Sequence, residues 1–288
     1  MKKNNYLEYE KISNSQALLH SNPKGVIQFI GSFVFGSFPA WAYKHLFQFL
    51  FDQGYSIILY RFPLNPFEFD HWKVSLQLLK EQQIVKSEII RKLKEKSKSS
   101  SVIEVYSKGK YLWLGHSLGC KYIILLEVLS NNSSRRNKIL KECLGELNAE
   151  KILKKIDSEK LLNQNFILDQ PSIFLAPEIS NTVRLLKSGW RISNNCTDPN
   201  QRQTECLIRS SSETFNLTSI VSFNWDEIAE DDVSFLSEQF QNKYFQPPLF
   251  KELQGWHFEP LSLHVEDLGQ LIVDLFEELK TRLLSKPI

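Results

Sequence analysis

The stretch KYLWLGHSLGCKYIILLE, residues 110–127, decides the fold of this chain. Apolar residues lead into GHSLG at residues 115–119, and a second apolar run of helical length follows. A strand that turns at once into a helix strains its apex residue, so the residues two before and two after the apex must be small. Gly115 and Gly119 meet that need around Ser117, although the chain has only 11 glycines.

The rest of the chain alternates short apolar runs with longer amphipathic ones. Connections of this length are typical of helices that cross over a parallel sheet, so we predict one α/β domain over residues 1–288 with helices on both faces of a mostly parallel sheet. The expected strands cover 24–30, 55–62, 110–114, 171–176, 217–223 and 248–253, and the expected helices cover 39–52, 71–96, 118–130 and 262–284.

Two segments do not fit this alternation. Residues 131–169 carry a charged, amphipathic helical pattern without a strand, which predicts a helical cap inserted over the sheet. Residues 190–216 are polar and contain two cysteines, and their pattern assigns them to no element.

Composition excludes several classes of protein. The net charge of +2 gives no general attraction to nucleic acid. No window reaches the roughly 18 consecutive apolar residues of a transmembrane helix. The polar N-terminal stretch MKKNNYLEYEKISN lacks the apolar core of a signal peptide, so we expect a cytoplasmic location.

The cysteines stand at positions 120, 143, 196 and 206 and form no CxxC pair. This spacing argues against a zinc cluster and against a disulfide framework.

A basic stretch over residues 86–110 has two interpretations. It could contact an acidic partner or an anionic membrane surface, but we favour a solvated helix end followed by a serine-rich loop.

Ser117 is the candidate nucleophile. The carboxyl edge of an open α/β sheet is where such folds place their sites, and the turn projects the serine side chain from that edge. The backbone N–H of Leu118 lies at the start of the following helix, so it can stabilise an oxyanion. A second donor is expected from the loop after the first strand, at the N–H of Ser32 or Phe33.

Chain order identifies the candidate base, because in this arrangement the acid and then the histidine follow the serine. Only His257 and His264 follow Ser117. His264 falls within the expected final helix. His257 lies in GWHFEP, a loop bounded by Gly and Pro, from which an imidazole can reach the serine. We therefore predict His257 as the general base.

The candidate acid is Asp226, the first carboxylate after the strand at 217–223. Its task is to accept the imidazole Nδ1–H and stabilise the imidazolium. The alternative is Glu178, which ends the preceding strand in FLAPEIS. The other acids of this stretch, Glu227, Glu230, Asp231 and Asp232, are expected to face solvent.

At these residues the chain resembles the α/β-hydrolase superfamily, through GHSLG, through NWDEI after a strand and through GWHFEP before the final helix. More narrowly it resembles the DUF1350 family of cyanobacteria and plastids. That resemblance is carried by FIGSFVFGSFP, by the FDH of residues 69–71, by GHSLGCK and by the late G-x-H-x-x-P. It implies a hydrolase-like fold, a serine nucleophile at Ser117 and a cyanobacterial or plastid setting, but the family has no assigned reaction.

We therefore expect a serine hydrolase that acts on an ester or thioester through an acyl-enzyme, without metal or organic cofactor. Aromatic residues of the first loop predict an apolar pocket for an acyl or lipid-like substrate. Two alternatives stay open: an acyltransferase with the same triad, and a non-catalytic interaction protein with this fold. Candidate pocket residues are Phe33, Phe35, Phe38, His71 and His116, although the phenylalanines could simply pack the loop and His71 could bond locally to Asp70.

Overall fold

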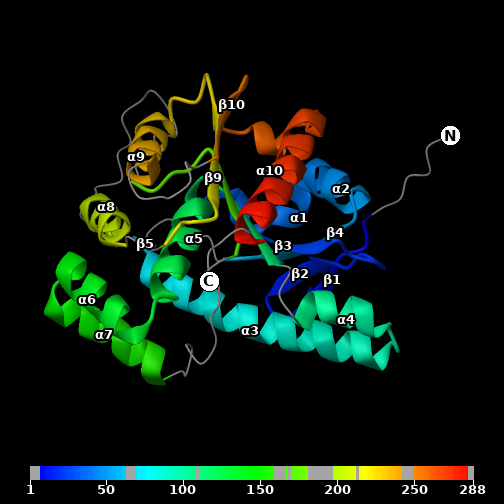
Figure 1. Cartoon of the computed structure of the whole chain (residues 1–288), viewed down its shortest axis with the longest axis horizontal. Coiled ribbons are helices and arrows are strands. Elements are labelled where there is room, and N and C mark those ends of the chain that lie inside the picture. The colour runs from blue at the N-terminus through cyan, green and yellow to red at the C-terminus, as the bar shows by residue number, and fades with distance from the viewer. Residues whose placement is uncertain are drawn as a thin grey trace.

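The computed structural model places an eight-stranded sheet between two layers of helices (Figure 1). The central strands are apolar on both faces, as expected where helices cover both sides of a parallel sheet. The structure describes residues 7–62, 69–107, 111–158, 167, 170–180, 197–211, 214–241 and 249–284.

The sheet has the order β1-β2-β4-β3-β6-β7-β9-β10. Every neighbouring pair from β4 to β10 is parallel, and β2 joins β4 in antiparallel fashion. The prediction of a mostly parallel sheet is confirmed. The strands are β1 Glu10–Ile12, β2 Ser15–Leu18, β3 Gly25–Ile30, β4 Tyr55–Tyr60, β6 Tyr111–His116, β7 Ser172–Leu175, β9 Thr218–Phe223 and β10 Leu249–Leu253.

Helices cover both faces of this sheet (Figure 1). One apolar cluster packs α3, α4 and α5 on one face, and a second packs α1, α2 and α10 on the other. The helices with well-defined bounds are α1 Pro39–Ala42, α2 Lys44–Asp52, α3 His71–Glu95, α4 Ser100–Ser107, α5 Leu118–Leu129, α6 Ser133–Leu144, α7 Glu146–Ser158, α8 Gln201–Ser210, α9 Glu230–Gln241 and α10 Glu266–Leu284.

Strand register positions the candidate site. Gly115 of β6 lies opposite Phe174 of β7, and Leu175 of β7 lies opposite Val221 of β9. Because these strands are parallel and in step, the segments that follow them leave the sheet at the same edge. Ser117, Glu178 and Asp226 stand on those three segments.

The hairpin of β1 and β2 and the helix α4 were not foreseen from the sequence. β1 and β2 form an antiparallel hairpin that extends the sheet beyond β4. The serine-rich stretch after α3 was expected to be a loop, but it forms α4, which buries Val102 and Tyr106. The apolar residues of that stretch outweigh the weak helix preference of its serines.

Several basic residues of the stretch at 86–110 form ion pairs within the chain. Residues 108–110 lie outside the described residues. Arg91 pairs with Glu88 and Glu95 on its own helix. Lys92 and Lys96 both reach Glu10 of β1. A membrane-surface contact there stays a prediction. Among the described helices, none combines the length and the apolar character that crossing a bilayer requires.

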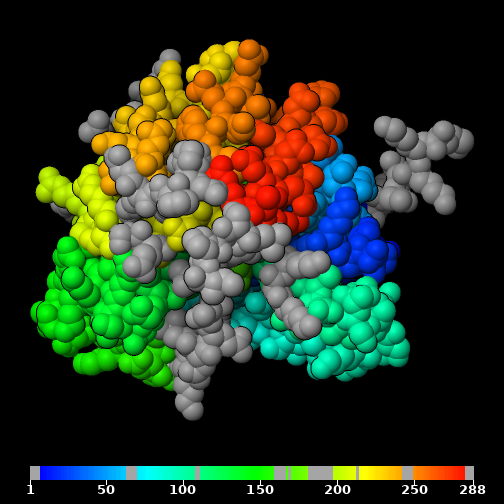
Figure 2. All heavy atoms as spheres, in the orientation of Figure 1, coloured from blue at the N-terminus to red at the C-terminus, as the bar shows by residue number. Residues whose placement is uncertain are grey.

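The proposed cap at 131–169 contains α6 and α7, which pack against each other, and α6 also packs against α8 (Figure 2). Residues 159–166, 168 and 169 lie outside the described residues, so coverage of the sheet by this segment stays a prediction. The unassigned stretch at 190–216 supplies β8, Thr197–Asp198, which pairs with β5, Phe69–Asp70. It also supplies α8, while residues 190–196, 212 and 213 lie outside the described part.

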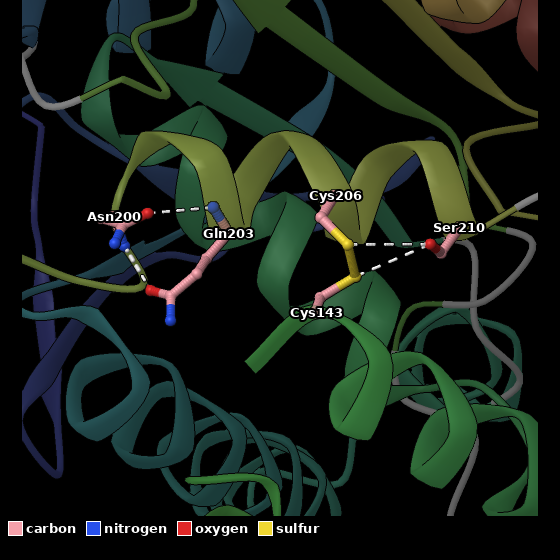
Figure 3. The surroundings of a disulfide bond; sticks show 5 residues. All are labelled: Cys143, Asn200, Gln203, Cys206 and Ser210. Atoms are coloured by element: carbon pink, nitrogen blue, oxygen red, sulfur yellow. Dashed lines mark hydrogen bonds between the residues drawn. A yellow bond between two sulfur atoms is a disulfide. The ribbon is translucent and has the colours of Figure 1, made fainter. Parts of the chain in front are cut away.

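A disulfide joins Cys143 of α6 to Cys206 of α8 (Figure 3), a cross-link that the argument against a disulfide framework did not foresee. The two cysteines are 63 residues apart, and only the packing of α6 on α8 brings them together. At its other end, α8 is fixed by a capping box in which Asn200 and Gln203 exchange side chain to backbone hydrogen bonds.

Loss of the Cys143–Cys206 bond should lower thermal stability, because the bond restricts the unfolded chain and ties α6 to α8. Disulfides of this kind contribute about 2–4 kcal/mol. We expect a lower midpoint of thermal unfolding for wild type in reductant and for the Cys143→Ser, Cys206→Ser double variant. The double variant should not respond to reductant. A wild-type midpoint that is the same with and without reductant would contradict this prediction.

Candidate active site

The turn between β6 and α5 has the strained geometry expected of it. Ser117 has φ 56° and ψ −122°, outside the regions that an L-residue normally occupies. Its N–H donates to the Leu175 carbonyl at 3.0 Å, and its own carbonyl accepts from the N–H groups of Cys120 at 3.0 Å and Glu178 at 3.2 Å. Such strain costs about 1–3 kcal/mol and persists only where surrounding bonds impose it.

The glycines on either side leave no room for a larger residue. A Cβ on Gly115 would lie 2.8 Å from Cδ1 of Ile123. A Cβ on Gly119 would lie 2.1 Å from the carbonyl oxygen of Ile30. The steric requirement inferred from the sequence is confirmed, and Gly119 additionally lets α5 approach the end of β3.

Ser117, His257 and Asp226 form a continuous chain of hydrogen bonds. The Nε2 atom of His257 lies 2.8 Å from Ser117 Oγ. Its Nδ1 atom lies 2.9 Å and 3.1 Å from the two carboxylate oxygens of Asp226. A carboxylate only accepts, so Nδ1 carries the proton and Nε2 is left to accept from the serine hydroxyl. All three side chains are buried.

Asp226 is held as an anion by several donors. Burial opposes its ionisation, but the bond from His257 and the backbone N–H groups of Ala229 and Ile228 outweigh burial and lower the pKa of Asp226. Those N–H groups lie 3.1 Å and 2.9 Å from its Oδ1. The carboxylate is therefore fixed in place as well as charged.

Hydrogen bonds join the loop of Asp226 to the loop of His257. The N–H of Asn224 donates to the Leu253 carbonyl, and that of Trp225 donates to the Gly255 carbonyl. In return, the N–H of Gly255 donates to Oδ1 of Asn224 at 3.1 Å. Bonds between the two loops thus help to hold Asp226 and His257 against each other.

His116 is fully buried and both of its ring nitrogens are engaged, while its role as a pocket residue stays a prediction. Its Nε2 is 2.8 Å from the His257 carbonyl, and its Nδ1 is 2.8 Å from the Tyr43 hydroxyl. Burial lowers the pKa of His116 to about 3, so the ring is neutral at ordinary pH. Nε2 therefore donates to the carbonyl and Nδ1 accepts from Tyr43, which fixes the backbone of the base.

The expected oxyanion donors differ in the hydrogen bonds that their backbone N–H groups make. The N–H of Leu118 begins α5, where no carbonyl within the helix can accept from it. The N–H of Ser32 donates to the Tyr43 hydroxyl at 3.0 Å, so Ser32 is wrong as an oxyanion donor. The N–H of Phe33 remains the prediction for the first loop.

The first-loop aromatics meet the His257 loop. Phe35 lies edge-on to Phe38 and to Phe258, with ring centroids 6.0 Å apart in each pair. The Phe258 ring in turn lies 5.1 Å from that of His257. Phe33 packs partly buried against the core. Walls of an acyl pocket remain a prediction for these phenylalanines, of which Phe35 contacts the His257 loop through Phe258.

Two further histidines are placed differently from expectation. His71 is buried, and its Nδ1 lies 3.2 Å from the hydroxyl of Tyr122 on α5. The Asp70 side chain accepts from the N–H of Lys73 and caps α3. His264 precedes α10, which begins only at Glu266, so the expectation that it lies within the helix was wrong.

Glu178 does not orient His257, because Asp226 occupies that position. Its Oε2 instead accepts from Ser117 Oγ at 3.3 Å. The pKa of Glu178 is raised to about 7, mainly by burial and also by the charge of Asp232, and these outweigh the lowering influence of His257, the Ser117 bond and Lys121. A second carboxyl group thus lies beside the nucleophile.

Sequence reasoning missed two charged groups near Glu178. Lys121 is fully buried on α5, one turn after Ser117, and its Nζ donates to the Pro199 carbonyl at 2.8 Å. Asp232 was expected to face solvent, but it is buried and accepts from the N–H groups of Ile179 and Ser180. Burial lowers the pKa of Lys121 to about 7. Within the described residues, no three His, Cys, Asp or Glu side chains are arranged to hold a metal ion.

Comparison with known proteins supports the fold. Residues 8–272 match a family model described as a protein of unknown function (DUF1350). No curated protein matches the chain. The cyanobacterial or plastid setting and the cytoplasmic location stay predictions.

Two similar solved structures are candidate carboxylesterases from Lactobacillus plantarum WCFS1. One is 13% identical and covers 95% of this chain and 98% of its own, with a TM-score of 0.53. The other is 9% identical and covers 95% and 97%, with a TM-score of 0.55. At these identities the likeness establishes the α/β-hydrolase fold.

Gly119→Ala should destabilise the protein, because its Cβ would overlap a backbone carbonyl that cannot rotate away. Overpacking usually costs about 1–3 kcal/mol, and we expect a value at or above the upper end. Urea unfolding measures this loss. A Gly119→Ala variant as stable as wild type would contradict the steric argument.

Proposed function

The chain belongs to the DUF1350 family, and we propose that it is a serine hydrolase that cleaves an ester or thioester through an acyl-enzyme. The observation that carries this proposal is the hydrogen-bond chain from Ser117 through His257 to Asp226. It stands at a strained turn on the carboxyl edge of the sheet, where the serine side chain has no structural task of its own.

Each residue of the site has its own task in the proposed reaction. His257 Nε2 takes the hydroxyl proton as Ser117 Oγ attacks the substrate carbonyl, and Asp226 stabilises the imidazolium. The N–H of Leu118, with that of Phe33, receives the charge that develops on the carbonyl oxygen. His257 returns the proton to the leaving alcohol or thiol. Water, activated by the same imidazole, then releases the acid and frees Ser117.

Exposed aromatic side chains support an apolar substrate. Trp225 and Trp256 are 49% and 59% exposed, and their rings lie 5.6 Å apart on the loops of Asp226 and His257. Trp41 and Phe38 are exposed near the first loop. Large apolar side chains are rarely left in water together without a binding role, so an acyl or lipid-like substrate fits this rim. The candidate carboxylesterases of the same fold are consistent with that class.

Ser117 should be the residue that a fluorophosphonate probe labels, because His257 is placed to remove its proton. We expect labelling of folded wild type near neutral pH, and none of Ser117→Ala. Ser130→Ala is the matched control, since it alters another buried serine next to α5 that bonds only to the helix backbone. Mass spectrometry of the labelled peptide identifies the site.

Absence of labelling in folded wild type across pH 6 to 9 would favour the non-catalytic interaction protein. Labelling followed by transfer of an acyl group to an added alcohol, with no free acid formed, would favour the acyltransferase. Both alternatives use the same fold, so the products decide between them.

Asp226→Asn should lower kcat by about 10⁴, the loss seen when the acid of a serine protease triad is replaced by its amide. The amide cannot hold the imidazolium, while its oxygen can still accept the two backbone N–H bonds at Oδ1. KM for a p-nitrophenyl ester and the unfolding midpoint should change little. Glu227→Gln, on the exposed neighbouring carboxylate, is the control and should keep its activity. An active Asp226→Asn enzyme would remove Asp226 from the triad.

A further inference from the structure

Glu178 is a buried carboxyl group in contact with the proposed nucleophile but outside the triad. It follows β7, and its N–H binds the Ser117 carbonyl at 3.2 Å, so its backbone is tied to the turn. Its Oε2 lies 3.3 Å from Ser117 Oγ. Within the described part of the chain, its Oε1 is buried and has no hydrogen-bond partner.

This geometry gives the Ser117 hydroxyl two acceptors for one proton. His257 Nε2 lies at 2.8 Å and Glu178 Oε2 at 3.3 Å. An ionised Glu178 can only accept, so it competes with His257 for that proton. A neutral Glu178 carries an O–H of its own and can donate to Ser117 Oγ. The serine proton is then directed to His257, as attack on a carbonyl requires.

We propose that Glu178 is a second catalytic carboxyl group that supports the nucleophile when protonated and suppresses it when ionised. The inference rests on the proposed function. No covalent step is added: the proton of Glu178 stays on its carboxyl group while it donates a hydrogen bond to Ser117 Oγ, and the serine proton passes to His257. The carboxylate form would also oppose the negative charge that develops on the substrate carbonyl oxygen when Ser117 Oγ bonds to the carbonyl carbon.

Several charged groups face Glu178 from the packed elements. Asp232 on α9 favours the neutral form, whereas Lys121 on α5 and His257 on the last loop favour the anion. Cys120 and Tyr122 on α5 also face it, and burial keeps both uncharged by raising their pKa values. Burial is the largest influence on Glu178 and places its pKa at about 7. Lys121 lowers the pKa of Glu178 only slightly, because burial lowers the pKa of Lys121 itself to about 7.

The test compares wild type with Glu178→Gln, a neutral side chain of the same shape. We would measure the rate of Ser117 labelling by a fluorophosphonate, and of p-nitrophenyl acetate hydrolysis, from pH 5 to 9. A single inhibitory ionisation at about pH 7 lowers the wild-type rate roughly 50-fold between pH 7 and 9 if the ionised form is inert. Glu178→Gln should lack this alkaline fall, whereas the control Glu227→Gln should keep it.

The outcomes separate the two proposals. Labelling of wild type at Ser117 with the same alkaline fall in Glu178→Gln would overturn the role of Glu178 and leave the hydrolase standing. No labelling of wild type at any pH would overturn the hydrolase and this inference with it. Labelling with an alkaline fall that only Glu178→Gln removes supports both.

Stability gives a second readout that does not depend on turnover. The folded pKa of Glu178 lies above its ordinary value of 4.5, so the neutral carboxyl favours folding below pH 4.5 and this contribution is lost as the pH rises to about 7. The unfolding midpoint of Glu178→Gln should therefore rise relative to wild type between pH 5 and pH 8. A difference that is the same at both pH values would show that Glu178 does not titrate in this range and would overturn the inference.

Discussion

The close approach of α5 to the end of β3 is the constraint on which the site depends. It is permitted only because Gly119 presents no side chain to the Ile30 carbonyl. With that contact made, Ser117 must take its strained conformation, and the N–H of Leu118 must begin the helix beside it. The positions of the proposed nucleophile and of one proposed oxyanion donor thus follow from one backbone contact. The acid and base need only reach this point from neighbouring strand ends.

The parts of the fold that could be predicted are those dictated by local sequence. Strands such as β3, β4 and β6 are buried on both faces, so they appear as uninterrupted apolar runs bounded by glycine or polar residues. The triad could also be proposed, because chain order and loop position left only His257, and Asp226 was the first carboxylate after its strand. Asp226 and Glu178 both follow strands, however, and only the structure shows which one faces the imidazole.

The features that could not be predicted depend on contacts between distant segments. Nothing near Cys143 indicates its pairing with Cys206, because the bond follows from how α6 packs on α8. Lys121 lies in an otherwise apolar helix, and its acceptor is the carbonyl of Pro199, 78 residues later. Ser32 is a similar case, because its N–H donates to the hydroxyl of Tyr43, which lies in a different segment just before α2. Local patterns give the position of such residues along an element but not the identity of their partners.

The hydroxyl of Tyr43 limits how the first loop of this protein can be altered. It contacts Ser32 in the first loop and His116 at the end of β6, and His116 holds the carbonyl of His257. The loop expected to shape the acyl pocket and the backbone of the base therefore share one rigid support. Side chains such as Phe35 and Phe38 could be replaced without moving this support, whereas lengthening or re-routing the loop backbone would displace His257. In this protein, changes of specificity are therefore expected from side-chain replacement on an unchanged loop backbone.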